Sequence, residues 1–171
     1  MGMRTVFLYL LFSFIYKGLV AQDAGKAQLK VYTFLQTECP ISQNAIATLN
    51  GLAAAFPSVK FISVFTSWDN QKQIQEFKKK YNLQAIVVHD KRHRLVSKLH
   101  AMVTPEVVVV AKKATIVYRG AIDNSYTSLG NRRQNGVEVY LKNVLQSYFT
   151  GTRISPTQTK AIGCKIEPIS K

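Results

Sequence analysis

Two kinds of hydrophobic pattern alternate along this chain. Short runs of β-branched and aromatic residues predict buried strands at residues 29–35, 59–66, 85–90, 106–111 and 115–120. Between and after these runs, apolar residues recur every three or four positions, which predicts helices at 40–56, 70–82, 93–101 and 136–151. The segment KKA between the last two strands favours a hairpin. Residues 152–171, which include two prolines, predict an extended tail.

The order of these elements is β-α-β-α-β-α-β-β-α. Strands that alternate with helices favour parallel pairing through right-handed crossovers, and the closing hairpin adds an antiparallel edge. The sequence therefore predicts an α/β fold with a central mixed sheet of about five strands and helices on both faces.

The first residues are typical of an export signal. Arg4 precedes an apolar run at 5–16, which is shorter than the roughly 20 residues that span a bilayer. The sequence predicts cleavage after Ala21, although an uncleaved anchor interrupted by Lys17 is the alternative. We expect an exported protein, periplasmic or secreted, in which a signal peptide (1–21) precedes one domain (22–151) and the tail (152–171).

The chain is strongly basic, with a formal net charge of +14 over 171 residues. Its Lys and Arg residues are scattered and are not interleaved with aromatic residues that could stack on bases, so we expect no nucleic-acid partner. A solvated basic surface is the simplest interpretation. Contact with an acidic protein or a membrane surface is the alternative.

Cys39, one of only two cysteines, stands where the first predicted strand ends and the first helix begins. Free amides and the macrodipole at a helix N-terminus stabilise an anion, so they lower a thiol pKa below its ordinary ~8.5. Cys39 at the N-cap, Pro40 at the first helical position and Ser42, whose hydroxyl can point at the sulfur, predict a reactive thiolate. Glu38 works against it, because a neighbouring carboxylate raises a thiol pKa. A structural cysteine at this position is the alternative.

A second motif, VTPEVVVV, places Thr104 and Pro105 just before the fourth predicted strand. Together with ECPIS, YRGAIDNSY and TKAIGCKI, it makes residues 29–166 resemble the thioredoxin fold. The resemblance is to the exported redoxin branch related to alkyl-hydroperoxide-reductase/thiol-specific-antioxidant and TlpA-like proteins. It implies a cis Thr104–Pro105 bond beside the redox cysteine, with the Thr104 backbone free to pair with an extended substrate.

The chain departs from the patterns of these relatives. Ser42 stands where thioredoxins carry their second cysteine, so local dithiol exchange is impossible. Gln36 and Tyr32 stand where peroxiredoxins carry Thr or Ser and Pro, so a standard peroxidase site is not expected either.

The histidines raise the question of a metal. His89, His93 and His100 lie near Met102 in the sequence, and some thioredoxin-fold relatives bind copper through two neighbouring cysteines and a histidine. Soft sulfur ligands favour Cu(I). With a single cysteine in the loop, we expect ordinary polar histidines, no metal and no organic cofactor.

Cys164, in the tail, is a possible second redox cysteine. It can resolve oxidised Cys39, form a static Cys39–Cys164 disulfide, or anchor the tail without meeting Cys39. The tail is long enough to reach Cys39, since an extended chain spans up to ~3.3 Å per residue. We favour separate roles, because the end of the last helix need not lie near the start of the first.

These observations favour an exported thiol-disulfide oxidoreductase or thiol peroxidase-like redoxin. Cys39 is its nucleophile, and Pro40, Ser42, Thr104 and Pro105 complete the site. Its partners are protein thiols or disulfides, or peroxide, together with an external thiol reductant. The alternative is a non-enzymatic binding module of the same fold or a copper chaperone.

Overall fold

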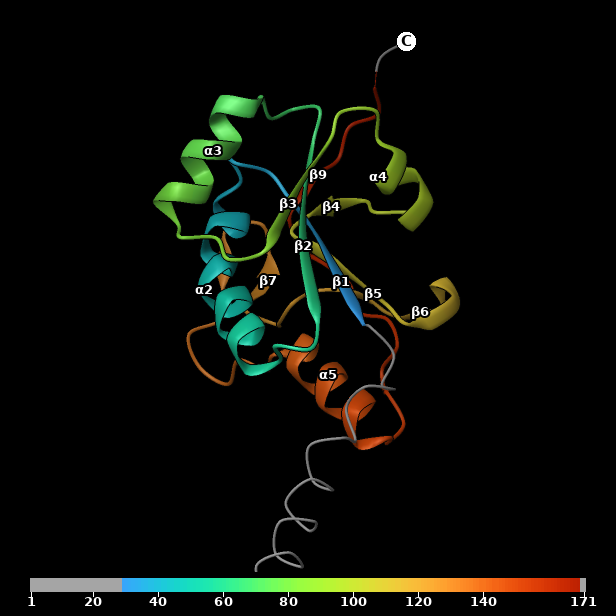
Figure 1. The fold of residues 1–171 in the computed structure, drawn as a ribbon. Helices are drawn as coiled ribbons and strands as arrows, with labels where there is room; N and C mark the ends of the chain where they lie inside the picture. Colours follow the sequence, from blue (N-terminus) through green and yellow to red (C-terminus); the bar gives the residue numbers. More distant parts are fainter. Residues whose placement is uncertain (1–28, 170–171) are drawn as a thin grey trace, which may run out of the picture.

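A mixed five-stranded sheet forms the centre of the molecule, which the computed structural model describes over residues 29–169 (Figure 1). The strand order is β3-β2-β1-β5-β6. The strands are β1 (Lys30–Leu35), β2 (Lys60–Thr66), β3 (Ile86–Asp90), β5 (Glu106–Val110) and β6 (Ile116–Gly120). β1, β2 and β3 are parallel, and β5 runs antiparallel to both β1 and β6. The predicted α/β fold with a mixed sheet is confirmed.

Helices cover both faces of this sheet, because its strands are apolar on both sides. In β1, Val31 and Leu35 point into one cluster and Phe34 into the other, as the two-residue period of a strand requires. The first cluster is covered by α2 (Pro40–Ala55), α3 (Gln71–Lys80) and α5 (Tyr140–Thr150). The second is covered by the short α4 (Arg94–Leu99), on the opposite side of the sheet in Figure 1.

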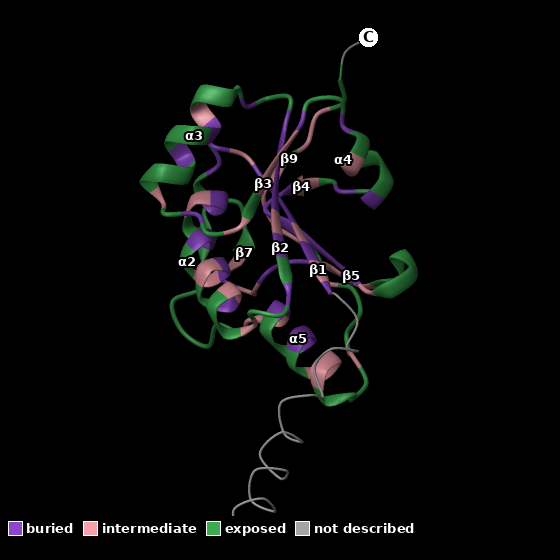
Figure 2. Cartoon of the chain, viewed as in Figure 1, coloured by how far each residue is buried: buried purple, intermediate pink, exposed green. Residues whose placement is uncertain are grey.

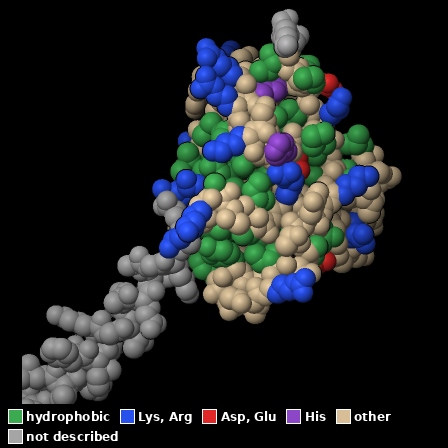
Figure 3. All heavy atoms as spheres, turned by 90° about the vertical axis from the view of Figure 1, so that its right-hand side faces the viewer, with side chains coloured by type: hydrophobic (Ala, Val, Ile, Leu, Met, Phe, Trp, Pro, Cys, Tyr) green, Lys and Arg blue, Asp and Glu red, His purple; other side chains and the backbone are tan. Residues whose placement is uncertain are grey.

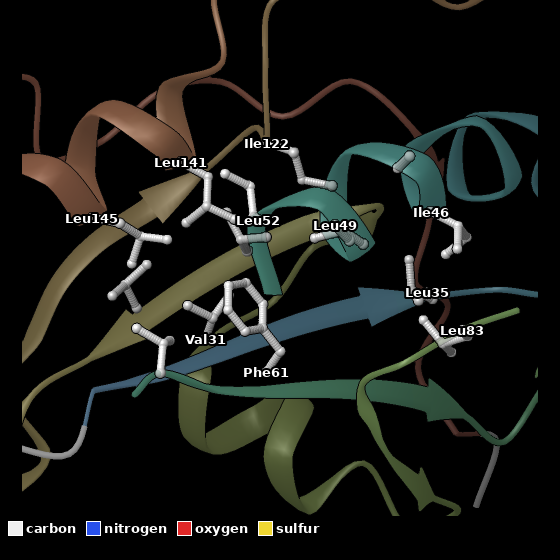
Figure 4. Close-up of a cluster of buried hydrophobic side chains, with 14 of the residues drawn as sticks. Val31, Leu35, Ile46, Leu49, Leu52, Phe61, Leu83, Ile122, Leu141 and Leu145 are labelled. Atoms are coloured by element: carbon white, nitrogen blue, oxygen red, sulfur yellow. The ribbon is translucent and has the colours of Figure 1, made fainter. Parts of the chain in front are cut away.

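The larger cluster forms the main core. Figure 4 shows Val31 and Phe61 of the sheet facing Leu49 and Leu52 of α2, with Leu141 of α5 beside them. The burial colours of Figure 2 follow the same division, with buried residues along the strands and exposed ones on the outer sides of the helices. This core packs β1 against α2, the two elements that meet at Cys39.

The last helix is shorter than predicted, since it begins at Tyr140 and not at 136. The backbone amide of Asn124 donates to the Glu138 carbonyl, and the Glu138 amide donates to the side-chain oxygen of Asn124. These bonds hold the backbone before Tyr140 in an extended path. The spacing of apolar residues correctly predicted a helix here, but the hydrogen bonds between Asn124 and Glu138 keep residues before Tyr140 out of it.

Five short elements of the described residues have no counterpart in the predicted order. β7 (Tyr126–Ser128) and β8 (Asn131–Arg132) form a small hairpin after β6, and a 3₁₀ turn, η1 (Lys112–Ala114), closes the predicted β5–β6 hairpin. In the tail, β9 (Cys164–Lys165) pairs antiparallel with β4 (Val103–Thr104). Part of the tail is therefore a strand docked on the domain.

The predicted signal peptide (1–21) lies outside the described residues, so it stays a prediction, as do the domain limits. Among residues 29–169, no helix combines the length and the apolar character needed to cross a bilayer.

Candidate functional site

The site is built at the junction of β1 and α2, where the chain turns at residues 36–39. Cys39 occupies the N-cap position in an extended conformation, and Pro40 is the first helical residue, as the sequence predicts. Proline suits this position because its missing N–H would have no helical partner there. The Cys39 amide donates to the carbonyl of Gln36, and its carbonyl accepts from Gln43. The backbone of the cysteine is thus held on both sides.

A buried carboxylate fastens this turn to the end of β2. Asp69 accepts hydrogen bonds from both the amide and the hydroxyl of Thr37, at 2.9 and 2.6 Å. Asp69 is 2% exposed, and its second oxygen has no hydrogen-bond partner among the described residues. Burial raises the pKa of Asp69 above its ordinary value, although the bonds from Thr37 oppose the shift. Sequence reasoning missed both residues, because an aspartate after a strand carries no signal of a partner 32 positions away.

Thr104 and Pro105 lie beside Cys39 from the other side. The Thr104–Pro105 peptide bond is cis. It joins β4 to β5, and the Cys39 thiol donates to the Thr104 carbonyl at 3.2 Å. Ser42 is fully buried under the cysteine, and its hydroxyl accepts from the Gln36 amide at 3.4 Å. The structure thus brings Pro40, Ser42, Thr104 and Pro105 together around Cys39, while the roles of these residues in a reaction stay a prediction.

The tail brings Cys164 to the same point. Cys39 and Cys164 are both free thiols, and their sulfur atoms lie 2.6 Å apart across 125 positions of sequence. The expectation of separate roles is therefore wrong for this structure. It failed because it considered only where α5 ends, whereas the path of the tail after α5 brings Cys164 back.

The expectation that the Thr104 backbone is free is also wrong. Thr104 pairs with Cys164 in the β4–β9 ladder, and its hydroxyl lies 3.4 Å from the Cys164 carbonyl oxygen. The Ile166 amide donates to the Met102 carbonyl at 2.9 Å, which extends the pairing. The strand edge beside Cys39 is occupied by the chain itself.

Two further contacts hold the tail in this path. The backbone of Arg119 in β6 pairs with Thr157 and Thr159, and the Thr159 hydroxyl contacts the buried Tyr118 hydroxyl at 2.6 Å. Burial raises the pKa of Tyr118 to about 12, so it stays a neutral hydrogen-bonding group. Closer to the cysteine, Gly163 lies against the Thr104 carbonyl, where a Cβ would come within 2.2 Å of the oxygen.

The two thiols ionise differently. Burial alone would raise the pKa of Cys39, but the Cys164 thiol, with help from the Cys164 amide and from the amide and hydroxyl of Ser42, lowers it below the ordinary value. Burial, together with the hydrogen bond to Cys39 and its charge, raises the pKa of Cys164 to about 12. Glu38 does not reverse this, since it is exposed and directed at Gln73 of α3. Of the two thiols, Cys39 is therefore the one that loses its proton more readily, and the Cys164 thiol donates to its sulfur.

A shallow hollow of about 280 Å³ opens onto both cysteines. Its other lining residues are Gln36, Glu38, Trp68, Lys165 and Glu167. Trp68 is the only tryptophan in the chain and is more than half exposed. The arrangement can donate two electrons to an oxidant that enters this hollow. One sulfur can attack the oxidant, and the other can then close a disulfide with it.

The histidines do not gather into a metal site. His93 is buried and its ring contacts the Ser67 hydroxyl at 2.9 Å, whereas His100 is an exposed residue that ends α4. The ring nitrogens of His89 have no hydrogen-bond partner among the described residues. Within residues 29–169, no group of three or more His, Cys, Asp or Glu is placed to hold a metal ion.

Solved structures share this fold. An uncharacterized conserved protein from Geobacillus kaustophilus matches with a TM-score of 0.69 and 18% identity, over 88% of this chain and 82% of its own. A hypothetical protein from Sinorhizobium meliloti matches with the same score and identity, over 85% and 82%. A putative thioredoxin from Neisseria meningitidis matches with a TM-score of 0.57 and 16% identity, over 73% and 77%. These similarities establish a thioredoxin-like fold.

No curated protein matches the sequence. The AhpC/TSA family model matches residues 19–119, which contain Cys39, Thr104 and Pro105 and end before the tail that carries Cys164. Because this match spans more than half of the chain, and the fold and the strand–cysteine–helix junction agree with it, the protein belongs to the AhpC/TSA family.

Proposed function

We propose that this protein is a thiol-dependent oxidoreductase in which Cys39 is the nucleophile and Cys164 the resolving cysteine. The observation that carries the proposal is the 2.6 Å contact between the two sulfurs, in which Cys164 donates and Cys39 accepts. Only the thiolate form of a cysteine attacks. The lowered pKa of Cys39 and the raised pKa of Cys164 therefore assign the first step to Cys39.

With a disulfide as oxidant, the Cys39 thiolate attacks one sulfur, forms a mixed disulfide and expels the other sulfur as a thiolate, which takes a proton. With a hydroperoxide, Cys39 takes the terminal oxygen as the O–O bond breaks. It becomes a sulfenic acid, and the alkoxide leaves with a proton as an alcohol. On the hydroperoxide route the Cys39 sulfur gives up two electrons in this step, whereas on the disulfide route Cys39 and Cys164 together supply the two electrons, and the transfer is complete when their disulfide closes.

In the second step Cys164 loses its proton and attacks the Cys39 sulfur. The products are the Cys39–Cys164 disulfide and either a released thiol or water. Once Cys39 is no longer an anion, its charge stops raising the pKa of Cys164, so the resolving thiol becomes easier to ionise. The sulfurs are already in contact, so ring closure needs little further loss of chain entropy. An external thiol then reduces the disulfide and completes the cycle.

The test compares Cys39→Ser with Cys164→Ser in two assays, disulfide reduction and hydroperoxide consumption, each with a dithiol reductant. We expect Cys39→Ser to be inactive. Cys164→Ser should complete the first step once and accumulate a mixed disulfide or sulfenic acid on Cys39, visible by intact mass. Trp68 lines the same hollow, so its fluorescence should report oxidation in the wild type. Equal activity of wild type and Cys39→Ser would remove the enzymatic proposal in favour of a non-enzymatic binding module.

A copper chaperone is the remaining alternative, because two sulfurs now face each other where the sequence suggested one. Titration of the reduced protein with Cu(I) separates the two. Stoichiometric uptake that protects both thiols from alkylation supports the chaperone, and its absence supports the redox cycle alone.

Export and a charged partner also belong to this proposal. The N-terminal pattern supports export, and intact-mass analysis should find a mature chain that starts near Gln22. Figure 3 shows Lys and Arg side chains spread over the face of α4 and the β5–β6 hairpin, with few acidic side chains among them. This charge supports contact with an acidic protein or a membrane surface, which should weaken as salt is added.

A further inference from the structure

The strand edge next to Cys39 would be the natural docking place for another polypeptide. An unpaired edge presents a row of amides and carbonyls that an extended segment can join as an added strand. Here β4 is such an edge, and it leads directly to Pro105 and the cysteine contact. In this protein, however, β9 already pairs with it.

The occupying strand fits closely. Gly163 approaches the Thr104 carbonyl so nearly that any side chain would clash with backbone, which cannot yield as a flexible side chain can. On one side of it, Ile166 packs against the smaller hydrophobic cluster under α4. On the other side, Ile162 lines a small hollow together with Ile41 and Pro105. Thr157 and Thr159 on β6 hold the beginning of the same segment.

The cysteine under this strand is almost inaccessible. Cys39 is 1% exposed, and its approach is the shallow hollow that it shares with Cys164. A polypeptide that binds as a strand on the β4 edge, with a disulfide placed at the Cys39 sulfur, would have to occupy the position that β9 already takes. A small molecule needs only the hollow.

We propose that β9 is a built-in occupant of the substrate edge, and that it restricts the first oxidation step to small two-electron oxidants, either low-molecular-mass disulfides or hydroperoxides. The proposal rests on the proposed function for its chemistry, whose two balanced steps are those given above. Residues 163–166 thus set specificity, and a polypeptide disulfide reacts with Cys39 only when this segment is released.

The test uses one reactive group on two carriers, iodoacetamide and an extended octapeptide bearing an iodoacetyl group. Both react with the reduced full-length protein, and peptide mapping gives the rate at Cys39 for each. We expect the wild type to favour iodoacetamide strongly. Gly163→Ala should displace β9 and lower the ratio of the two rates at least tenfold.

Gly51→Ala is the matched control, because no atom lies within 4 Å of the position that its Cβ would take. It should leave the ratio unchanged. Ile166→Ala leaves the backbone contact at Gly163 intact and removes only side-chain packing, so it should lower the ratio by a smaller amount. This variant tests the proposal if Gly163→Ala does not fold. An equal rate for the two reagents in the wild type, or an unchanged ratio in folded Gly163→Ala or Ile166→Ala, would overturn the inference.

Alkylation needs no turnover, so this result is independent of the proposed function. If the ratio responds but neither cysteine variant alters redox activity, β9 still covers the edge and the redox cycle fails. If the cycle holds but the ratio does not respond, the protein is an oxidoreductase without this restriction. The same variants, tested with hydrogen peroxide and with a peptide disulfide, then show whether the preference extends to oxidants.

Discussion

The two cysteines meet at one point, but the regions that bring them there are different. Cys39 is held by its neighbours in sequence, β1 and α2, and by a core beneath them. Cys164 is held almost entirely by contacts from far away, with Thr104 60 positions before it and with a tail segment fastened to β6. The first sulfur is stabilised as an anion and the second as a thiol. In the proposed cycle, the region held by neighbours in sequence supplies the nucleophile and the docked tail supplies the resolving thiol.

The largest effect should come from removing the Cys39 side of this pair. In Cys39→Ala, the hydrogen bond and the charge that raise the pKa of Cys164 are lost, while its burial remains. The pKa of Cys164 should therefore fall below about 12, but burial, the largest cause of its rise, should keep it above the ordinary ~8.5. Alkylation of Cys164 at pH 8 should become faster, since each unit by which the pKa falls raises the thiolate fraction about tenfold. An unchanged rate would mean that burial alone controls this thiol.

The reverse change should act in the opposite direction. In Cys164→Ala, Cys39 loses the thiol that donates to it, so its pKa should rise. A charge-assisted hydrogen bond contributes ~1.5 kcal/mol, so alkylation of Cys39 at pH 7 should slow about tenfold if accessibility is unchanged. Cys164→Ser keeps a donor at this position and should show a smaller shift. The pH dependence of the alkylation rate gives the pKa of Cys39 in the wild type, in Cys164→Ala and in Cys164→Ser. A lower pKa in Cys164→Ala would contradict the assignment.

Weakening the attachment of the tail should have a moderate effect on stability. Tyr118→Phe removes the hydroxyl that donates to the Ala121 carbonyl and contacts Thr159. We expect a loss of about 1 kcal/mol in the free energy of unfolding, since a buried hydrogen bond contributes about that much. Tyr126→Phe, whose hydroxyl makes an exposed bond to Asn44, is the matched control and should lose less. Urea denaturation of the reduced proteins gives both values, and equal losses would show that Tyr118 does not fasten the tail.

The smallest effect concerns the fastening of the Cys39 turn. The pKa of Asp69 is raised in the folded protein from 3.8, so its charged form is disfavoured there. Its contribution to stability is greatest below 3.8 and declines as pH rises through the folded pKa. Asp69→Asn keeps an acceptor for Thr37 and does not titrate. The free energy of unfolding of this variant relative to wild type should therefore increase from pH 3 to pH 7. A decrease would mean that the folded protein favours the charged form of Asp69, so that its pKa is lowered and not raised.

The sequence predicted the sheet, the helices and the strand–cysteine–helix junction because their signals are local. The strand period of β1, the spacing of apolar residues in α2 and the Cys39–Pro40–Ser42 helix start all lie within some thirty residues. The early start assigned to the last helix failed because Asn124 binds the backbone at Glu138. Local period does not reveal such a partner.

Sequence by itself therefore determined the fold class and the place of Cys39, since both follow from residues close together in the chain, whereas the lowered pKa of Cys39 depends chiefly on the distant Cys164. Tertiary structure alone decided that Cys164 meets Cys39, that Asp69 braces the turn, and that the β4 edge is closed by β9. The reason is physical. A two-residue strand has almost no pattern of its own, and it forms only where a distant edge, here Val103–Thr104, offers backbone partners and a glycine lets the chain approach.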